Sequence, residues 1–167
     1  ARETSRVLNS VRPDYIRVRT FALHPKSPMQ KLVEDGIIVP MTDEEIVREI
    51  RLLVSGLDEM HSYFSCGDYG PNLLMQVDGY LDESKKTMLK EIDRYLSLTP
   101  EQKKVYSYIR RSSFMNYPLD IVKNEDVMNR LLPEIGRLES EPDGFNKYIA
   151  MLMSQTIPQP QTDGEWN

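Results

Sequence analysis

The chain has 167 residues, of which 40% are hydrophobic and 28% charged, so it suits one ordinary domain or one large part of a bigger protein. Its net charge of −5 argues against a general binder of nucleic acid or of anionic membranes, because phosphate contacts need a basic surface. No apolar run approaches the roughly 20 residues that span a bilayer. The single cysteine, Cys66, excludes an intramolecular disulfide and fits a cytoplasmic protein.

The chain opens with a short helix followed by a predicted strand. The segment "ETSRVLNSV" is typical of a helix that ends at Arg12, because a residue before proline disfavours helical angles. Residues 15–21, "YIRVRTF", alternate in character and therefore predict a strand that Pro25 ends. The two faces of this strand carry Ile16, Val18 and Thr20 on one side and Tyr15, Arg17, Arg19 and Phe21 on the other.

Capping signals mark the next two helices. Pro28 suits the first turn of a short helix, "PMQKLVED", and Gly36 suits its C-cap. Thr42 and Glu45 form a capping box for a longer helix, in which each side chain bonds the backbone of the other residue. The longer helix has a continuous apolar stripe at helical spacing: Ile46, Val47, Ile50, Leu53, Val54 and Leu57.

The remainder is mainly helical. We expect a short strand within 60–72, an amphipathic helix over 82–98, and a further helix that begins with the cap residues Thr99, Pro100 and Gln102. Residues 155–167 are rich in Pro and Gln, which predicts a disordered tail. The inward stripes of the three later amphipathic helices are Met88, Leu89, Ile92, Tyr95 and Leu96; then Val127, Met128, Leu131, Leu132 and Ile135; then Phe145, Tyr148, Ile149, Leu152 and Met153.

The stretch "RPDYIRVRTFALHPKSPMQKLVEDG" resembles the late-barrel segment of radical S-adenosylmethionine (SAM) enzymes. In that superfamily a barrel strand runs into a loop of the type P-G-[ST]-P followed by a hydrophobic residue and a glycine. Pro25, Ser27, Pro28 and Gly36 stand at matching places, and Lys26 replaces the usual glycine. Segments "MTDEEIVREIRLLVSGL" and "ESKKTMLKEIDRYLSL" follow in the order of one subgroup, so the resemblance covers roughly residues 5–112.

The resemblance implies a fold, a chemistry and a division of the chain. The fold would be mainly α with one to two short strands: a late (β/α)-barrel segment over 1–80, a C-terminal helical region over 81–154 and the tail over 155–167. The parent would cleave SAM at a [4Fe–4S] cluster held by a C-x-x-x-C-x-x-C loop. With one cysteine this chain cannot build that loop. We therefore interpret it as a C-terminal fragment that is inactive alone, with no catalytic residue and no metal site of its own.

The candidate site residues are Arg17, Arg19 and His24. On the resemblance, Arg17 and Arg19 point into the barrel lumen, where their guanidinium groups suit the carboxylate of SAM or an anionic substrate. The alternative is an exposed sheet face with solvated arginines, or arginines paired with acids such as Asp14. His24 could carry a proton near neutral pH, although a loop histidine with one hydrogen bond is the simpler interpretation. Ser27 is interpreted as a helix cap.

Other polar residues receive structural interpretations. His61, Cys66 and Asp68 are possible metal ligands, but their spacing matches no zinc pattern. Asp68 and Asn72 flank a glycine-containing loop and suit a turn. The pair at 110–111, both arginines, ends a helix, where cations offset the helix dipole.

A second hypothesis is a small helical interaction or assembly module without catalysis, supported by the run of amphipathic helices and the acidic composition. A lone strand cannot form a stable sheet, so the strand over 15–21 needs a neighbour. We expect that neighbour to be the rest of a parent chain, or a second copy that pairs through the exposed strand edge to form a homodimer. No nucleic acid or membrane partner is indicated.

Overall fold

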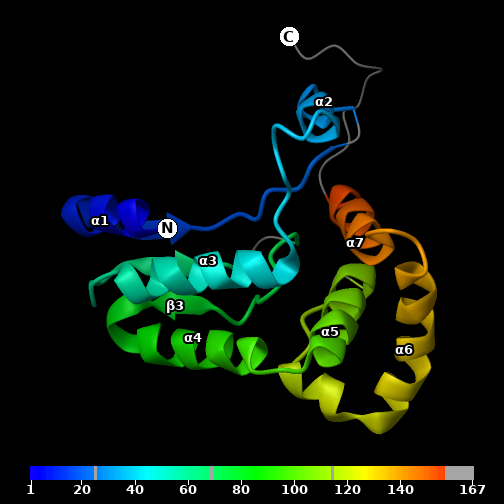
Figure 1. Ribbon diagram of the computed structural model, residues 1–167. Helices are drawn as coiled ribbons and strands as arrows, with labels where there is room; N and C mark the ends of the chain where they lie inside the picture. Colours follow the sequence, from blue (N-terminus) through cyan, green and yellow to red (C-terminus); the bar gives the residue numbers. More distant parts are fainter. Residues whose placement is uncertain (25, 68–69, 114, 157–167) are drawn as a thin grey trace.

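The computed structural model describes residues 1–24, 26–67, 70–113 and 115–156. These residues form seven α-helices, one 3-10 helix and three short strands, which confirms the expected mainly-α fold. Figure 1 shows a small sheet beside α3 and α4, a group of helices α5–α7, and α2 on an arm away from the rest. The elements are α1 (Arg2–Val11), β1 (Tyr15–Arg17), α2 (Met29–Glu34), α3 (Asp43–Gly56), β2 (Tyr63–Ser65), β3 (Asp78–Tyr80), α4 (Leu81–Leu96), α5 (Pro100–Ser113), η1 (Leu119–Lys123), α6 (Glu125–Glu139) and α7 (Gly144–Ser154).

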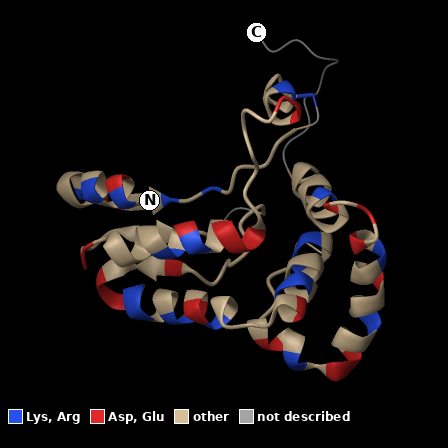
Figure 2. Ribbon diagram, in the orientation of Figure 1, with Lys and Arg blue, Asp and Glu red and all other residues tan. Residues whose placement is uncertain are grey.

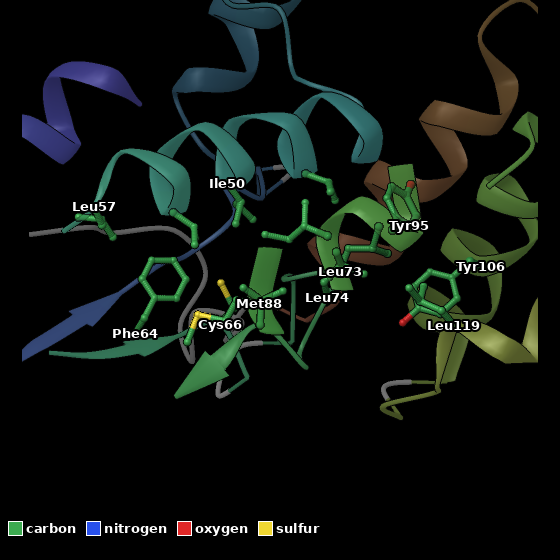
Figure 3. Close-up of a cluster of buried hydrophobic side chains, with 14 of the residues drawn as sticks. Ile50, Leu57, Phe64, Cys66, Leu73, Leu74, Met88, Tyr95, Tyr106 and Leu119 are labelled. Atoms are coloured by element: carbon green, nitrogen blue, oxygen red, sulfur yellow. The ribbon is translucent and has the colours of Figure 1, made fainter. Parts of the chain in front are cut away.

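The sheet has the order β1-β2-β3, with β1 and β2 parallel and β3 antiparallel to β2. The connection from β1 to β2 contains α3, as parallel pairing requires a crossover. Ile16 and Phe64, directly opposite each other on β1 and β2, are buried in the main hydrophobic cluster with side chains of α3 and α4. Figure 3 shows Phe64 and Cys66 close to Leu57, Ile50 and Met88 in this cluster. The helices therefore cover one face of the sheet and leave Tyr15, Arg17 and Tyr80 exposed on the other, which we call the open sheet face.

The first strand is shorter than the sequence predicted. Its alternation is confirmed, because Ile16 and Thr20 are buried whereas Tyr15 and Phe21 are half exposed. The ladder nevertheless ends after Val18, whose amide donates to the Ser65 carbonyl at 2.9 Å. Beyond that point the Asn72 side chain bonds the Val18 carbonyl and the Thr20 amide, so no strand continues there. The expected end at Pro25 lies outside the described residues.

Strand β3 was not anticipated. Its sequence "DGY" has a central glycine and no apolar alternation, so nothing local marks it as a strand. Gly79 has φ 132°, which favours glycine, and a Cβ there would lie 2.8 Å from the Ser84 hydroxyl oxygen. The strand forms because β2 offers a pairing edge, which is a tertiary effect.

The predicted helix ends are confirmed. Arg12 leaves α1 in the left-handed conformation, with φ 48°. Gly36 has φ 70°, and the Ile37 amide donates to the Leu32 carbonyl at 2.8 Å, the hydrogen bond of a Schellman cap. The capping boxes at 42–45 and 99–102 both form, each with reciprocal side-chain-to-backbone bonds.

The apolar stripes of the helices are also confirmed, but they are not equally buried. In α3 and α4 most stripe residues are almost fully buried. Of the stripe residues, only Ile135 in α6 and only Ile149 and Met153 in α7 are buried, because these helices pack chiefly on α5 and on each other. None of the described helices combines the length and the apolar character needed to cross a membrane.

The arm between β1 and α3 is apolar but packs little. Figure 2 shows that the chain between α2 and α3 is almost without charge, whereas Lys and Arg alternate with Asp and Glu along α4, α5 and α6. Six large apolar side chains of the arm are at least one-third exposed: Phe21, Met29, Leu32, Ile37, Val39 and Met41.

Candidate functional site

The open face of the sheet carries two rows of side chains. Because strand residues alternate between faces, each register line of the three strands gives one row. The first row is Tyr15, Tyr63 and Tyr80, and the second is Arg17, Ser65 and Asp78. The two rows together define the open sheet face.

The first row is an aromatic cluster. The rings of Tyr15 and Tyr63 stack with centroids 5.7 Å apart, and Tyr63 meets Tyr80 edge to face at 5.1 Å. His61 stacks on Tyr80 at 4.4 Å and also contacts Asp82, with 3.0 Å between Nδ1 and Oδ2. Both end tyrosines remain exposed, so the row offers aromatic surface to a ligand or partner.

The second row places a carboxylate next to these rings. Asp78 accepts hydrogen bonds from the Ser65 hydroxyl at 3.0 Å and from the Gly67 amide at 2.8 Å. A further hydrogen bond to Asp78 raises the pKa of Tyr63, because the carboxylate favours the protonated phenol. This row therefore holds an arginine at one end and a carboxylate at the other.

The three predicted site residues do not share one position. Arg17 lies exposed on the open sheet face beside Ser65, and Arg19 is exposed two residues further along, after the strand has ended. His24 is half-buried at the base of α2, where its Nδ1 accepts a hydrogen bond from the Lys26 amide at 3.1 Å. Ser27 accepts from the Met29 amide at 3.3 Å, so its hydroxyl does bond the start of α2.

The carboxyl ends of β1 and β2 are closed by Asn72, which is fully buried. Its side-chain oxygen accepts from the Thr20 amide at 2.8 Å, and its nitrogen donates to the carbonyls of Val18 and Cys66 at 2.8 and 2.9 Å. The sequence suggested only a turn residue here. Asn72 is instead a clamp on the strand ends, where ligands of parallel sheets usually bind.

Two arginines in the last turn of α5, where the sequence predicted helix-end cations, also hold the same loop from the other side. Arg110 and Arg111 are 1% and 2% exposed. Arg110 donates to the carbonyls of Gly70 and Asn72 at 3.2 and 3.0 Å. Burial lowers the pKa of Arg110.

Arg111 continues this contact into α3. It donates to the Pro71 carbonyl and forms a buried ion pair with Asp43, with 2.6 Å between Nη2 and Oδ1. Four buried polar atoms around the loop have no hydrogen-bond partner in the described residues: Thr20 Oγ1, Asp43 Oδ2, Arg110 Nε and Arg111 Nε. The sequence did contain a signal for the burial of Arg110. This residue follows the buried Tyr106 at the i, i+4 spacing, so both lie on one face of the helix.

Two of the three residues considered as metal ligands, His61 and Cys66, lie within the described residues. His61 pairs with Asp82, and Cys66 is 1% exposed within the hydrophobic cluster. Asp68 lies outside the described residues. Within the part of the chain that the structure describes, no group of three or more His, Cys, Asp and Glu side chains could hold a metal ion.

Comparisons with known proteins give no relative: no family model, no curated protein and no solved structure matches the chain.

Proposed function

We propose that this chain is the C-terminal part of a radical SAM protein and that its open sheet face contributes to the lumen of the parent barrel. The observation that carries the proposal is the parallel pair β1–β2, whose connection contains α2 and α3, with helices on the Ile16 face of the pair and Arg17 on the other face. Barrels of alternating strands and helices repeat this unit and place their ligands on the face or rim away from the helices.

A radical SAM parent uses two groups, SAM and an iron–sulfur cluster. The residues present fit only SAM. An arginine with its fork of donors, next to a row of tyrosines, suits the carboxylate and the adenine ring of SAM. The iron–sulfur cluster does not fit, since its binding loop needs three cysteines and the chain has one. In the parent, SAM bound to the cluster would supply the 5′-deoxyadenosyl radical. Arg17, Arg19 and His24 would position SAM or the substrate.

This assignment predicts the effect of removing the two arginines. In the parent protein, the Arg17→Ala/Arg19→Ala variant should bind SAM or substrate about tenfold or more weakly, because each charge-assisted hydrogen bond is worth about 1.5–3 kcal/mol. The absorbance of the iron–sulfur cluster should not change. Titration calorimetry measures both affinities, with Arg137→Ala on the exposed surface of α6 as the matched control. Unchanged affinities for both ligands would show that the arginines do not face the lumen.

A second candidate function is a non-catalytic interaction or assembly module. The apolar arm favours it, because Ile37 and Val39 are 69% and 80% exposed and lie on one short segment. Contiguous exposed apolar surface of this kind marks contact sites for other proteins.

One experiment separates the two functions: sequencing the natural reading frame upstream of Ala1. A C-x-x-x-C-x-x-C loop about a barrel's length upstream, roughly 100–200 residues, would support the radical SAM proposal. A start codon directly before Ala1, or a long upstream frame without that loop, would overturn it and leave the interaction module.

A further inference from the structure

Both ends of the apolar arm are fixed at one loop between β2 and β3. At the start of the arm, the Thr20 amide donates to the Asn72 side chain at 2.8 Å. At its end, Asp43 pairs with Arg111, which also donates to the Pro71 carbonyl. The arm therefore leaves the body of the molecule and returns to it at one place, which we call the arm base.

The described chain also ends at the arm base. Thr156, the last described residue, lies against Gly70 of the same loop: a Cβ on Gly70 would be 3.6 Å from the Thr156 Cβ. Residues 157–167, "IPQPQTDGEWN", lie outside the described residues and follow directly in the sequence. This segment, which we call the tail, therefore starts beside the arm.

The arm presents a strip of exposed apolar side chains between its tip and its base. At the tip, the Ile37 amide donates to the Leu32 carbonyl at 2.8 Å, and this cap brings Ile37 back beside α2. Ile37, Val39 and Met41 occupy every second position of the returning segment and are 69%, 80% and 48% exposed. Apolar side chains grouped in this way mark a contact site.

We propose that the tail folds back along the arm and packs on this strip, with the Trp166 ring against Leu32 and Ile37 at the tip. The length of the tail allows this contact. Ile37 is six positions from Asp43, so it lies no more than about 20–22 Å from the arm base. Ten positions separate Trp166 from Thr156, and they span up to about 33–36 Å.

The composition of the tail suits this surface. Ile157, Pro158 and Trp166 are apolar, and a tryptophan buries a large area when it packs. The charged side chains of the tail, Asp163 and Glu165, are both acidic, whereas residues 19–41 carry three basic side chains and two acidic ones.

Tethering favours the tail over other occupants of the strip. A segment that starts beside its site has an effective concentration on the order of millimolar, so it binds ahead of a second copy or another protein of modest affinity. If the arm is a contact site for another protein, the tail is an intramolecular competitor that this partner has to displace. The inference itself rests on neither proposed function, because it is tested without SAM and without a partner protein.

The test is the fluorescence of Trp166, the only tryptophan of the chain. In the full chain at about 1 µM, we expect emission at a shorter wavelength than that of N-acetyltryptophanamide and about threefold weaker quenching by acrylamide, because a packed ring is shielded from water. Val39→Asp should remove both effects, since it places a carboxylate in the strip opposite an acidic tail. Val7→Asp is the matched control: it makes the same change at an exposed position of α1 and should alter neither property.

Hydrogen exchange gives the converse measurement. Trp166→Ser should make the amides of Val39 and Met41 exchange at least about threefold faster, because the strip loses its cover. Unchanged exchange rates at these two amides would overturn the proposal.

The fluorescence experiment has three further outcomes against the proposal. Emission equal to that of N-acetyltryptophanamide, as expected of a disordered tail, overturns it. A shifted emission that Val39→Asp leaves unchanged places the ring elsewhere and also overturns it. A shift that develops only as the protein concentration rises assigns the contact to a second copy instead. Circular dichroism confirms that each variant is folded, and Ile37→Asp keeps the test decisive if Val39→Asp unfolds.

Discussion

The side chain of Asn72 forms three hydrogen bonds to backbone groups that lie 6 to 54 positions away in the sequence. All of these groups are at the ends of β1 and β2, where a longer strand would have satisfied them. A buried amide can accept and donate at once, which neither a carboxylate nor an apolar side chain can do. One residue thus decides where the sheet ends.

Asn72→Ala should lower the free energy of unfolding by about 2–4 kcal/mol, because it leaves buried backbone donors and acceptors without partners. Urea denaturation followed by circular dichroism measures the loss. Asn146→Ala is the matched control, since Asn146 is exposed and its side chain donates a hydrogen bond to the nearby Asp143 side chain. Equal losses for the two variants would mean that the clamp is not important for stability.

At the scale of elements, local signals agree with the structure at the ends of α1 and α2 and at the starts of α3 and α5. The capping box of α3 shows why: the Thr42 amide and hydroxyl both donate to the Glu45 carboxylate at 2.8 Å. All the atoms involved lie within four residues, so the interaction forms from the local sequence alone. The backbone hydrogen bond from Thr42 is the main cause that lowers the pKa of Glu45.

This lowered pKa predicts a pH-dependent contribution to stability. A carboxylate whose pKa is lower in the folded state stabilises the fold at pH values above its ordinary pKa, here 4.5. This contribution to stability is lost as the pH falls through the lowered pKa. Glu45→Gln should therefore be less stable than the wild type at pH 7, by about 0.5 kcal/mol, and the difference should disappear as the pH falls through the lowered pKa. Thermal unfolding at pH 7, 5, 4 and 3 measures this difference.

Thr42→Ala provides the control for the pH experiment. It removes one donor to the Glu45 carboxylate and keeps the backbone donor. The pH-dependent contribution of Glu45 to stability should therefore become smaller without disappearing. A difference between wild type and Glu45→Gln that is constant from pH 7 to pH 3 would contradict the assignment.

For the whole molecule, the decisive contacts join the sheet to the α5–α7 group. Arg110 and Arg111 reach from α5 to the loop at 70–72, and Arg111 also reaches Asp43 at the start of α3. Lys103 adds a contact to Glu44 at 3.1 Å on the same side. A buried ion pair is costly to break because the remaining charge stays in a poorly solvated place.

Arg111→Met should destabilise the protein by about 3–5 kcal/mol, since it leaves Asp43 buried and unpaired. The double variant Arg111→Met/Asp43→Leu should recover part of this loss, because neither charge remains. Urea denaturation of both single variants and the double variant gives the coupling energy.

The control for this cycle is Arg51→Met, which breaks the exposed Arg51–Asp93 pair at 2.5 Å and should cost no more than about 1 kcal/mol. Should Arg111→Met cost as little as Arg51→Met, the buried pair would not hold the two parts of the molecule together.

The sequence by itself determined the helices, their caps and the alternation of residues 15–21, because these depend on spacing and on contacts within a few residues. It placed Arg17 on the face opposite Ile16, as the structure has it, whereas Arg19 is exposed beyond the end of the strand. Tertiary structure alone decided the length of β1, the existence of β3 and the burial of Arg110 and Arg111. Each of these results from partners tens of residues away, such as Asn72 for Thr20 and Asp43 for Arg111. Hydrogen bonds and ion pairs over such distances depend on how the chain folds back, which no local pattern records.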